Sequence, residues 1–174
     1  VTTFAGTGFA DQARFNSPNG VCVNDEGVVF VADTGNHRIL HVTPDGDVST
    51  LGNGTAGYQD GKGVGIVMFN APNDVVIDGE GNVLVADSEN HRIRKISADG
   101  QVTTLAGNGV AGHQDGDGAH AQFHSPSGLC VDSEGVVYVA DYSNHRIRRI
   151  TSDGEVSTVA GNGQRGHQDG VGNA

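Results

Sequence analysis

Histidine is the residue with the most chemical potential in this chain, and it recurs within one short phrase. "ADTGNHRIL", "ADSENHRIR" and "ADYSNHRIR" begin at residues 32, 86 and 140. Their imidazoles, on His37, His91 and His145, could in principle bind a zinc ion. The phrases start 54 residues apart (32 to 86, then 86 to 140). A fixed period of that length is typical of a repeat protein.

The whole phrase is explained more fully as an architectural part of each repeat. Equivalent side chains of a ring of repeats need not converge, so no metal site is predicted. The Asp ends a strand, where its carboxylate can accept backbone N–H bonds across a turn. The Asn suits a position with positive φ, and the Arg can pair with a carboxylate of a neighbouring repeat. The structural set is Asp33, Asn36, His37, Arg38, Asp87, Asn90, His91, Arg92, Asp141, Asn144, His145 and Arg146.

A second pattern, "QDGDG" (Gln114–Gly118), places Asp115 and Asp117 close together. A full calcium loop needs more oxygen ligands and a closing Glu, which do not follow. The related stretches "QDGKG" and "QDGVG" lack the second Asp. We therefore interpret these stretches as turns, with weak metal binding as the alternative. The chain also has no G-x-S-x-G or H-E-x-x-H motif. No catalytic residue and no cofactor is predicted.

Cys22 and Cys130 occupy the same position of their repeats, where the middle repeat has Val76. A position that accepts Val is expected to be a buried packing position, so both are predicted to be buried free thiols. Asn53-Gly54-Thr55 is a formal N-glycosylation sequon, which matters only if the chain is secreted.

The elements that position these residues are predicted from the middle repeat. Residues 73–78, 83–87, 92–96 and 101–107 read as four short strands separated by turns, and no helical period is present. The second strand is apolar on both faces, whereas the fourth is rich in Thr and Ser. Sheets of this kind, repeated radially, make a β-propeller. The fold class is therefore all-β, a propeller with three four-stranded antiparallel blades. Phe15, Phe69 and Phe123, each three residues before a Pro, are expected to plug the space between blades.

Charge and hydropathy exclude two classes of partner. The formal net charge of −11 argues against nucleic acid, because neutralising phosphates requires basic residues. No apolar run approaches the ~20 residues of a membrane helix, so no membrane partner is predicted. The basic residues gather after the histidines, where we expect ion pairs with turn carboxylates; an anion-binding strip is the alternative. These residues are Arg38, Arg92, Arg94, Lys95, Arg146, Arg148 and Arg149.

The motifs AD-x-x-NHRI, DG-x-V, AG-NG, G-x-QDG and F-x-x-P together resemble NHL-repeat β-propellers. The resemblance implies a platform for protein interactions, an extracellular sensor or, as in the tripartite-motif relatives, an RNA reader. Related propellers also include an amidating lyase, which has a zinc site in its channel and relies on His, Arg and Tyr side chains that line the channel. No His falls on a predicted inner strand; these strands start at Asn19, Asn73 and Ser127.

We therefore expect a non-catalytic scaffold that binds a protein, peptide or glycan, with Asn19, Asn73 and Ser127 at the channel mouth as ligand-binding candidates. The alternative is a metal-dependent propeller enzyme, amidating-lyase-like or a lactone or ester hydrolase.

Three blades do not close a ring, since propellers typically have four to eight. Residues 13–174 contain three whole periods of 54 residues, so two copies would make six blades. A homodimer of half-propellers is predicted. Residues 1–12 are surplus to these periods and resemble the fourth strand of a preceding blade. The alternative is that the chain is a piece of a longer propeller.

Overall fold

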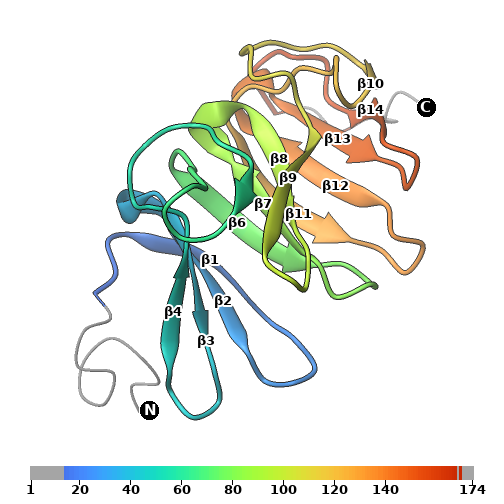
Figure 1. Ribbon diagram of the computed structural model, residues 1–174. Coiled ribbons are helices and arrows are strands. Elements are labelled where there is room, and N and C mark those ends of the chain that lie inside the picture. Colours follow the sequence, from blue (N-terminus) through green and yellow to red (C-terminus); the bar gives the residue numbers. More distant parts are fainter. Residues whose placement is uncertain (1–13, 168, 170–174) are drawn as a thin grey trace.

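The protein is described by a computed structural model over residues 14–167 and 169, and its described part is built from three antiparallel sheets (Figure 1). The first blade contains β1 (Pro18–Val23), β2 (Val29–Asp33), β3 (Arg38–Val42) and β4 (Val48–Leu51). The second blade contains β5 (Gly61–Lys62), β6 (Pro72–Ile77), β7 (Val83–Asp87), β8 (Arg92–Ile96) and β9 (Gln101–Ala106). The third blade contains β10 (Gly116–Asp117), β11 (Pro126–Val131), β12 (Val137–Asp141), β13 (Arg146–Ile150) and β14 (Glu155–Ala160).

The sheets lie side by side as the blades of a propeller. The strand orders are β1-β2-β3-β4, β5-β9-β8-β7-β6 and β10-β14-β13-β12-β11. The first long strands, β1, β6 and β11, are neighbours in space, and the later strands of each blade fan outward from them (Figure 1). The predicted all-β propeller fold is confirmed. The surplus segment 1–12 lies outside the described residues. No helix in the described part of the chain is long and apolar enough to cross a membrane.

Tight turns connect the long strands of each blade. In the second blade the β8–β9 hairpin closes through the Gly100 N–H, which donates to the Ser97 carbonyl at 2.8 Å. Gly100 has a φ of +80°, which glycine adopts without the steric cost of a Cβ. Turn chemistry and strand alternation thus act together to give the predicted hairpins.

The second and third blades have one strand more than predicted. The short strands β5 and β10 pair antiparallel with β9 and β14. Each belongs to a connection between blades, which we call the first strap (residues 52–71) and the second strap (residues 107–125). The straps therefore extend the outer edge of the blade that follows them. Two-residue strands next to glycines are too short to show an alternation of apolar residues, so the sequence pattern missed them.

Two apolar clusters fill the junctions between blades. The first joins Ala32 and Ile39 to Val75 and Val85, and the second joins Ala86 and Ile93 to blade three. Phe69 and Phe123 are fully buried in these clusters, as expected for plugs, and Phe15 is half-buried. β7 is buried along its whole length, which agrees with its continuous apolar sequence. The core thus lies between sheets, so each blade is stabilised mainly by its neighbours.

Candidate functional site

Asp87, at the end of β7, connects three segments of the second blade. One carboxylate oxygen accepts the backbone N–H of Asn70 at 2.8 Å. The other accepts from the side chains of Asn90 at 2.8 Å and Arg94 at 2.6 Å. A backbone N–H thus donates to this carboxylate, but the donor residue lies in the strap before β6 and not in the turn that follows Asp87, where it was expected. The Asp therefore ties the entry of the innermost strand to the end of the second strand.

Arg94, one of the basic residues expected to pair with turn carboxylates, does so, whereas the arginine directly after the histidine does not. Arg92, directly after the histidine, donates to the carbonyls of Asn90 and Asn108 instead of pairing with a neighbouring carboxylate. Arg94 is fully buried and pairs with Asp87 and with Asp60 of the first strap, both at 2.6 Å. β8 lies between β7, which ends at Asp87, and β9, whose other edge pairs with β5 of the strap. From there the Arg94 guanidinium reaches the strap, where it also donates to the carbonyls of Gln59 and Met68.

The third blade repeats this arrangement with Arg148, Asp141 and Asp115. Partial burial acts to raise the pKa of Asp115, but hydrogen bonding and the charge of Arg148 hold that pKa below its ordinary value. The Gln-Asp-Gly stretches are therefore anchors of the straps, not simple turns. In the first blade Arg38 itself pairs with Asp33 at 2.7 Å, within the same blade.

Positive φ falls on the histidine and not on the preceding asparagine. His91 has a φ of +54°, and Asn90 ends a short 3₁₀ turn while its amide binds Asp87. The imidazoles connect successive blades. His37 Nδ1 accepts the backbone N–H of Ala71 at 3.0 Å, and His91 Nδ1 accepts that of Ser125 at 3.2 Å. Within residues 14–167 and 169, no group of three or more His, Cys, Asp or Glu is arranged to hold a metal ion.

The three candidates for the channel mouth lie at the start of β1, β6 and β11. The Asn19 side-chain amide donates to Asn73 Oδ1 at 2.9 Å across the first junction. Ser127 Oγ donates to the carbonyl of Ala140 within its own blade, at 3.4 Å. The structure therefore brings the two asparagines together, whereas Ser127 bonds elsewhere. Their role in ligand binding stays a prediction.

The outward sides of the first and third blades expose residues whose counterparts are buried in the second blade. Val21 is 63% exposed, whereas its counterpart Val75 is 1% exposed. Ile147 is 42% exposed, whereas Ile93 is fully buried. We call Val21 and Val23 the open face of the first blade, and Cys130, Tyr142 and Ile147 the open face of the third blade. All five residues are exposed. They mark where a further blade would pack.

The exposure of the two cysteines also depends on the blade that carries them. Cys22 is half-buried in the first junction, where burial and the nearby charge of Asp74 raise the pKa of its thiol to about 12. Cys130 is exposed, so the prediction that it is buried is wrong for the described chain. Its counterpart Val76 packs against the second junction, whereas Cys130 belongs to the open face of the third blade. Asn53 of the sequon is exposed in the first strap.

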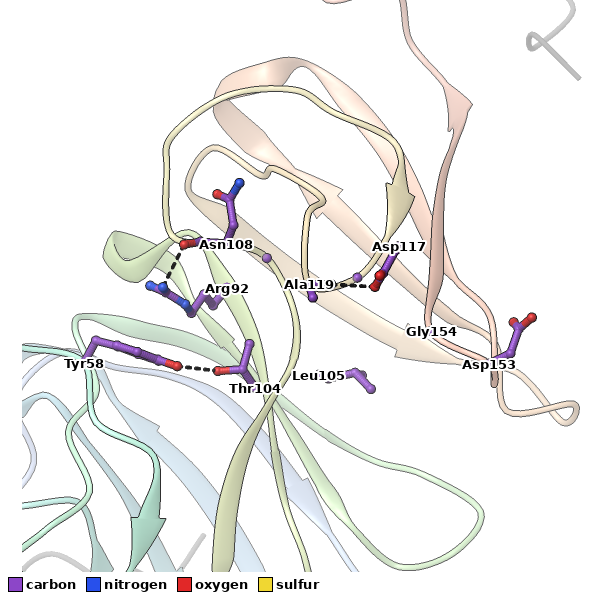
Figure 2. Close-up of a pocket in the computed structure, with 11 residues that line it drawn as sticks. Tyr58, Arg92, Thr104, Leu105, Asn108, Asp117, Ala119, Asp153 and Gly154 are labelled. Carbon is purple, nitrogen blue, oxygen red and sulfur yellow. Dashed lines mark hydrogen bonds between the residues drawn. The ribbon is translucent and has the colours of Figure 1, made fainter.

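A polar cavity of about 500 Å³ lies on the outer side of the second junction, between β9, the second strap and the β13–β14 turn (Figure 2). The Arg92 guanidinium stacks 3.8 Å from the Tyr58 ring centre, and the Tyr58 hydroxyl lies 3.0 Å from Thr104 Oγ1. Asp117 and Asp153 also line the cavity. Hydrogen bonds to Ala119 and His120 hold the pKa of Asp117 below its ordinary value.

Sequence reasoning missed this cavity, although the repeats carry a signal for it. At the positions of Asp117 and Asp153 the preceding repeat has Lys62 and Asp99, which pair at 2.9 Å. The change from Lys to Asp removes that ion pair from the edge of the cavity.

Comparison with known proteins agrees with this repeated geometry. The pattern of the family described as NHL repeat matches residues 15–48, 69–96 and 123–150, one stretch in each blade. The chain belongs to the NHL-repeat family. The matched stretches run from the plug phenylalanine of each blade to the end of the blade's third long strand, except that the first extends to Val48. They include the Asp and His residues described above.

Two relatives of this NHL-repeat chain are much longer proteins. NHL repeat-containing protein 2 from Gallus gallus is 39% identical over 111 residues, which are 63% of this chain and 15% of that protein. Protein SUPPRESSOR OF QUENCHING 1, chloroplastic, from Arabidopsis thaliana is 37% identical over 108 residues, 59% of this chain and 10% of that protein. The chain thus spans a small part of each relative.

A solved structure has the same fold. It is described as a structural genomics protein of unknown function from Bacteroides thetaiotaomicron. It aligns with a TM-score of 0.66 at 23% identity, over 83% of this chain and 36% of that chain.

Proposed function

We propose that this NHL-repeat chain is a non-catalytic binding scaffold, and that its ring is closed by a second copy of the chain. The observation that carries the proposal is the match between the two open faces. Each internal junction places the side of one blade that carries Ile39 or Ile93 against the innermost strand of the next. The third blade presents Ile147 on that side, and the first blade presents Val21 on the other.

A second copy fits this surface better than an unrelated partner. Its first blade would offer Val21 and Val23 to the open face of the third blade, as β11 is offered to the second blade within one chain. Two copies related by a two-fold axis would form two such junctions at once. Six blades lie within the range of four to eight that propellers use. Exposed aliphatic side chains on two matched faces would be removed from water, which favours association.

The ligand of the closed ring is proposed to be a protein, peptide or glycan bound at the channel mouth, where Asn19 donates to Asn73. Amide groups at the rim of a channel can form hydrogen bonds with such ligands without catalysing a reaction. Alanine at Asn19, Asn73 and Ser127 together should weaken any ligand found, and an unchanged affinity would remove these residues from the site. Stoichiometric metal retained after dialysis would favour the enzyme alternative over a non-catalytic scaffold.

Light scattering tests the assembly directly. The 17.9 kDa chain should scatter as a particle of twice that mass at micromolar concentration and dissociate on dilution. Ile147→Asp places a charge on the open face of the third blade and should leave a folded monomer. Val110→Asp is the matched control, because Val110 is also exposed, at 58%, but lies in the second strap. A wild-type chain that remains a folded monomer would overturn self-assembly.

Thiol labelling gives an independent readout of the same junction. Cys130 is accessible in the single chain and would be covered in the closed ring, so its labelling rate should fall as protein concentration rises. Cys22 serves as the internal control because burial and its raised pKa suppress the reactive thiolate at all concentrations. A Cys130 rate that does not depend on concentration would contradict closure by a second copy.

A further inference from the structure

Both internal junctions contain the same hydrogen bond between two unusual backbone positions. A histidine after the 3₁₀ turn accepts, through Nδ1, the backbone N–H of the residue that precedes the next innermost strand: His37 from Ala71, and His91 from Ser125. All four residues have positive φ, between +47° and +54°. Non-glycine residues rarely adopt this conformation, so the two halves of each bond are held in place by the surrounding turns.

The same two halves stand at opposite ends of the described chain. His145 has a φ of +53° and Ser17 has a φ of +51°, so both already adopt the conformation seen at the internal junctions. Both are exposed, whereas His37 and His91 are half-buried. His145 lies beside the open face of the third blade, and Ser17 directly precedes β1. Each is therefore preformed to complete the bond with another copy.

We propose that His145 of one copy accepts a hydrogen bond from the backbone N–H of Ser17 of a second copy, and that this bond makes the closed ring labile to acid. The inference rests on the proposed function, since it concerns the junction that a second copy would close. It adds a specific contact at that junction and a condition under which the ring opens.

The chemistry of the imidazole gives the direction of the effect. Nδ1 can accept only while the ring is neutral, with its proton on Nε2. Protonation adds a second proton to the ring, on Nδ1. Nδ1 can then no longer accept, and two N–H donors face each other. Histidine is the side chain that changes charge between about pH 5 and 8, so lowering the pH through this range removes the acceptor and with it the bond. His91, which makes the equivalent bond, has a lowered pKa, because of burial first and then the charge of His124.

The charged groups around the closing junction do not favour protonated His145. At the second internal junction the His91 ring faces His124, Glu89 and Arg92. The counterparts at the closing junction are Asn16, Ser143 and Arg146, so the single acidic neighbour is replaced by a neutral serine.

The segment that would approach from the second copy brings one further cation, Arg14. The carboxylate that binds this segment, Asp33, is already paired with Arg38. Protonation of His145 therefore adds positive charge to a junction whose free charges are already positive.

Sedimentation equilibrium between pH 7.5 and 5.5 measures the effect on the dimer. At one pH unit below the histidine pKa of the dissociated chain, protonation should weaken each junction about tenfold. Because a two-fold dimer has two such junctions, its association constant should fall by up to about a hundredfold. The measurement is made at pH values where the circular dichroism spectrum matches that at pH 7.5, so that dissociation is separated from unfolding.

A conservative variant and a matched control assign the effect to one residue. His145→Asn keeps a residue type that tolerates positive φ but cannot be protonated, so its dimer affinity should change little with pH. His120→Asn changes an exposed histidine of the second strap and should keep the wild-type pH dependence.

The two proposals fail in different ways. A wild-type chain that is monomeric at pH 7.5 overturns ring closure by a second copy, and the histidine contact with it. A dimer whose affinity is the same at pH 5.5, or a His145→Asn variant with the wild-type pH dependence, overturns the histidine contact and leaves the closed ring standing.

Discussion

β8 of the second blade and β13 of the third blade have nearly the same sequence, RIRKI and RIRRI, in different surroundings. Ile93 of β8 is fully buried by the third blade, whereas Ile147 of β13 is 42% exposed. The buried Arg94 and Arg148 are nevertheless alike, each paired with two carboxylates. Interactions within a blade and its strap are thus complete in a single chain, while apolar burial between blades depends on a neighbour.

The first blade differs from both in its polar core. Leu40 stands at the position of Arg94 and Arg148, and it is buried. Arg38 pairs with Asp33 in place of the missing arginine. The residues before Pro18 include no Gln-Asp-Gly stretch that could supply the second carboxylate. The buried arginine therefore occurs together with an acidic strap, because a buried guanidinium is stable only when its charge is compensated.

The largest expected effect comes from breaking the buried network of the second blade. Asp87→Ala leaves Arg94 buried with one carboxylate fewer and removes the acceptor for Asn70, so it should lower the free energy of unfolding by about 3–5 kcal/mol. Urea unfolding measures this change.

Two controls belong with that variant. Asp33→Ala should cost about 1–3 kcal/mol, because Arg38 is partly exposed and can reach water. Asp99→Ala, in the outer hairpin, should have a clearly smaller effect than either. Equal losses for Asp87→Ala and Asp99→Ala would contradict the architectural role of the repeated aspartate.

The second prediction compares an isoleucine that is buried in a junction with its exposed counterpart in the third blade. Ile93→Ala opens a cavity in the second junction and should destabilise the fold by about 2–5 kcal/mol. Ile147→Ala should cost clearly less when the protein is dilute and monomeric, but should weaken the dimer at higher concentration. Unfolding curves at two protein concentrations measure both. A similar loss for the two variants in dilute solution would show that the third blade is already covered in the single chain.

A moderate effect is expected from the pH dependence of the second junction. Burial and His124 lower the pKa of His91, so the unfolded chain binds a proton more readily than the folded chain does. Stability is therefore full above the ordinary histidine pKa of 6.5 and is lost as the pH falls through the lowered pKa.

Melting temperatures at pH 7.5 and 5.5, measured in the monomeric Ile147→Asp background, should show this loss. Adding His91→Asn should reduce it. An identical pH dependence with and without His91→Asn would mean that other groups dominate.

The smallest effect concerns the exposed pair Lys62–Asp99 at the outer edge of the second blade. Hydrogen bonds from Ser97 and Lys62 and the charge of Lys62 lower the pKa of Asp99 to about 2. Lys62→Ala should raise this pKa toward its ordinary value, as followed by NMR titration, with little change in melting temperature. The third blade offers the reverse test: Asp117→Lys should lower the pKa of Asp153 if the two positions are equivalent. No shift of Asp153 would show that the cavity edge has a different geometry.

Much of the fold could be predicted from the sequence because its signals are local and repeated three times. Short β-branched runs, Gly-containing turns and a 54-residue period predict blades wherever they occur. The architectural role of Asp87 as a backbone acceptor followed from its place at a strand end. Its actual donor, Asn70, could not be predicted, because the two residues meet only when the strap folds back along the blade.

The sequence by itself determined the strands, the turns, the repeat and the family, because each depends on residues close together in the chain. The tertiary structure alone decided which arginine pairs with the buried aspartate, that the histidine and not the asparagine takes positive φ, and that the straps add a strand. It also decided which copies of a repeated residue are buried, since Ile93 packs against the third blade whereas Ile147 is exposed in the described part of the chain. The physical reason is that burial and ion pairing are set by neighbours in space, which a local pattern does not specify.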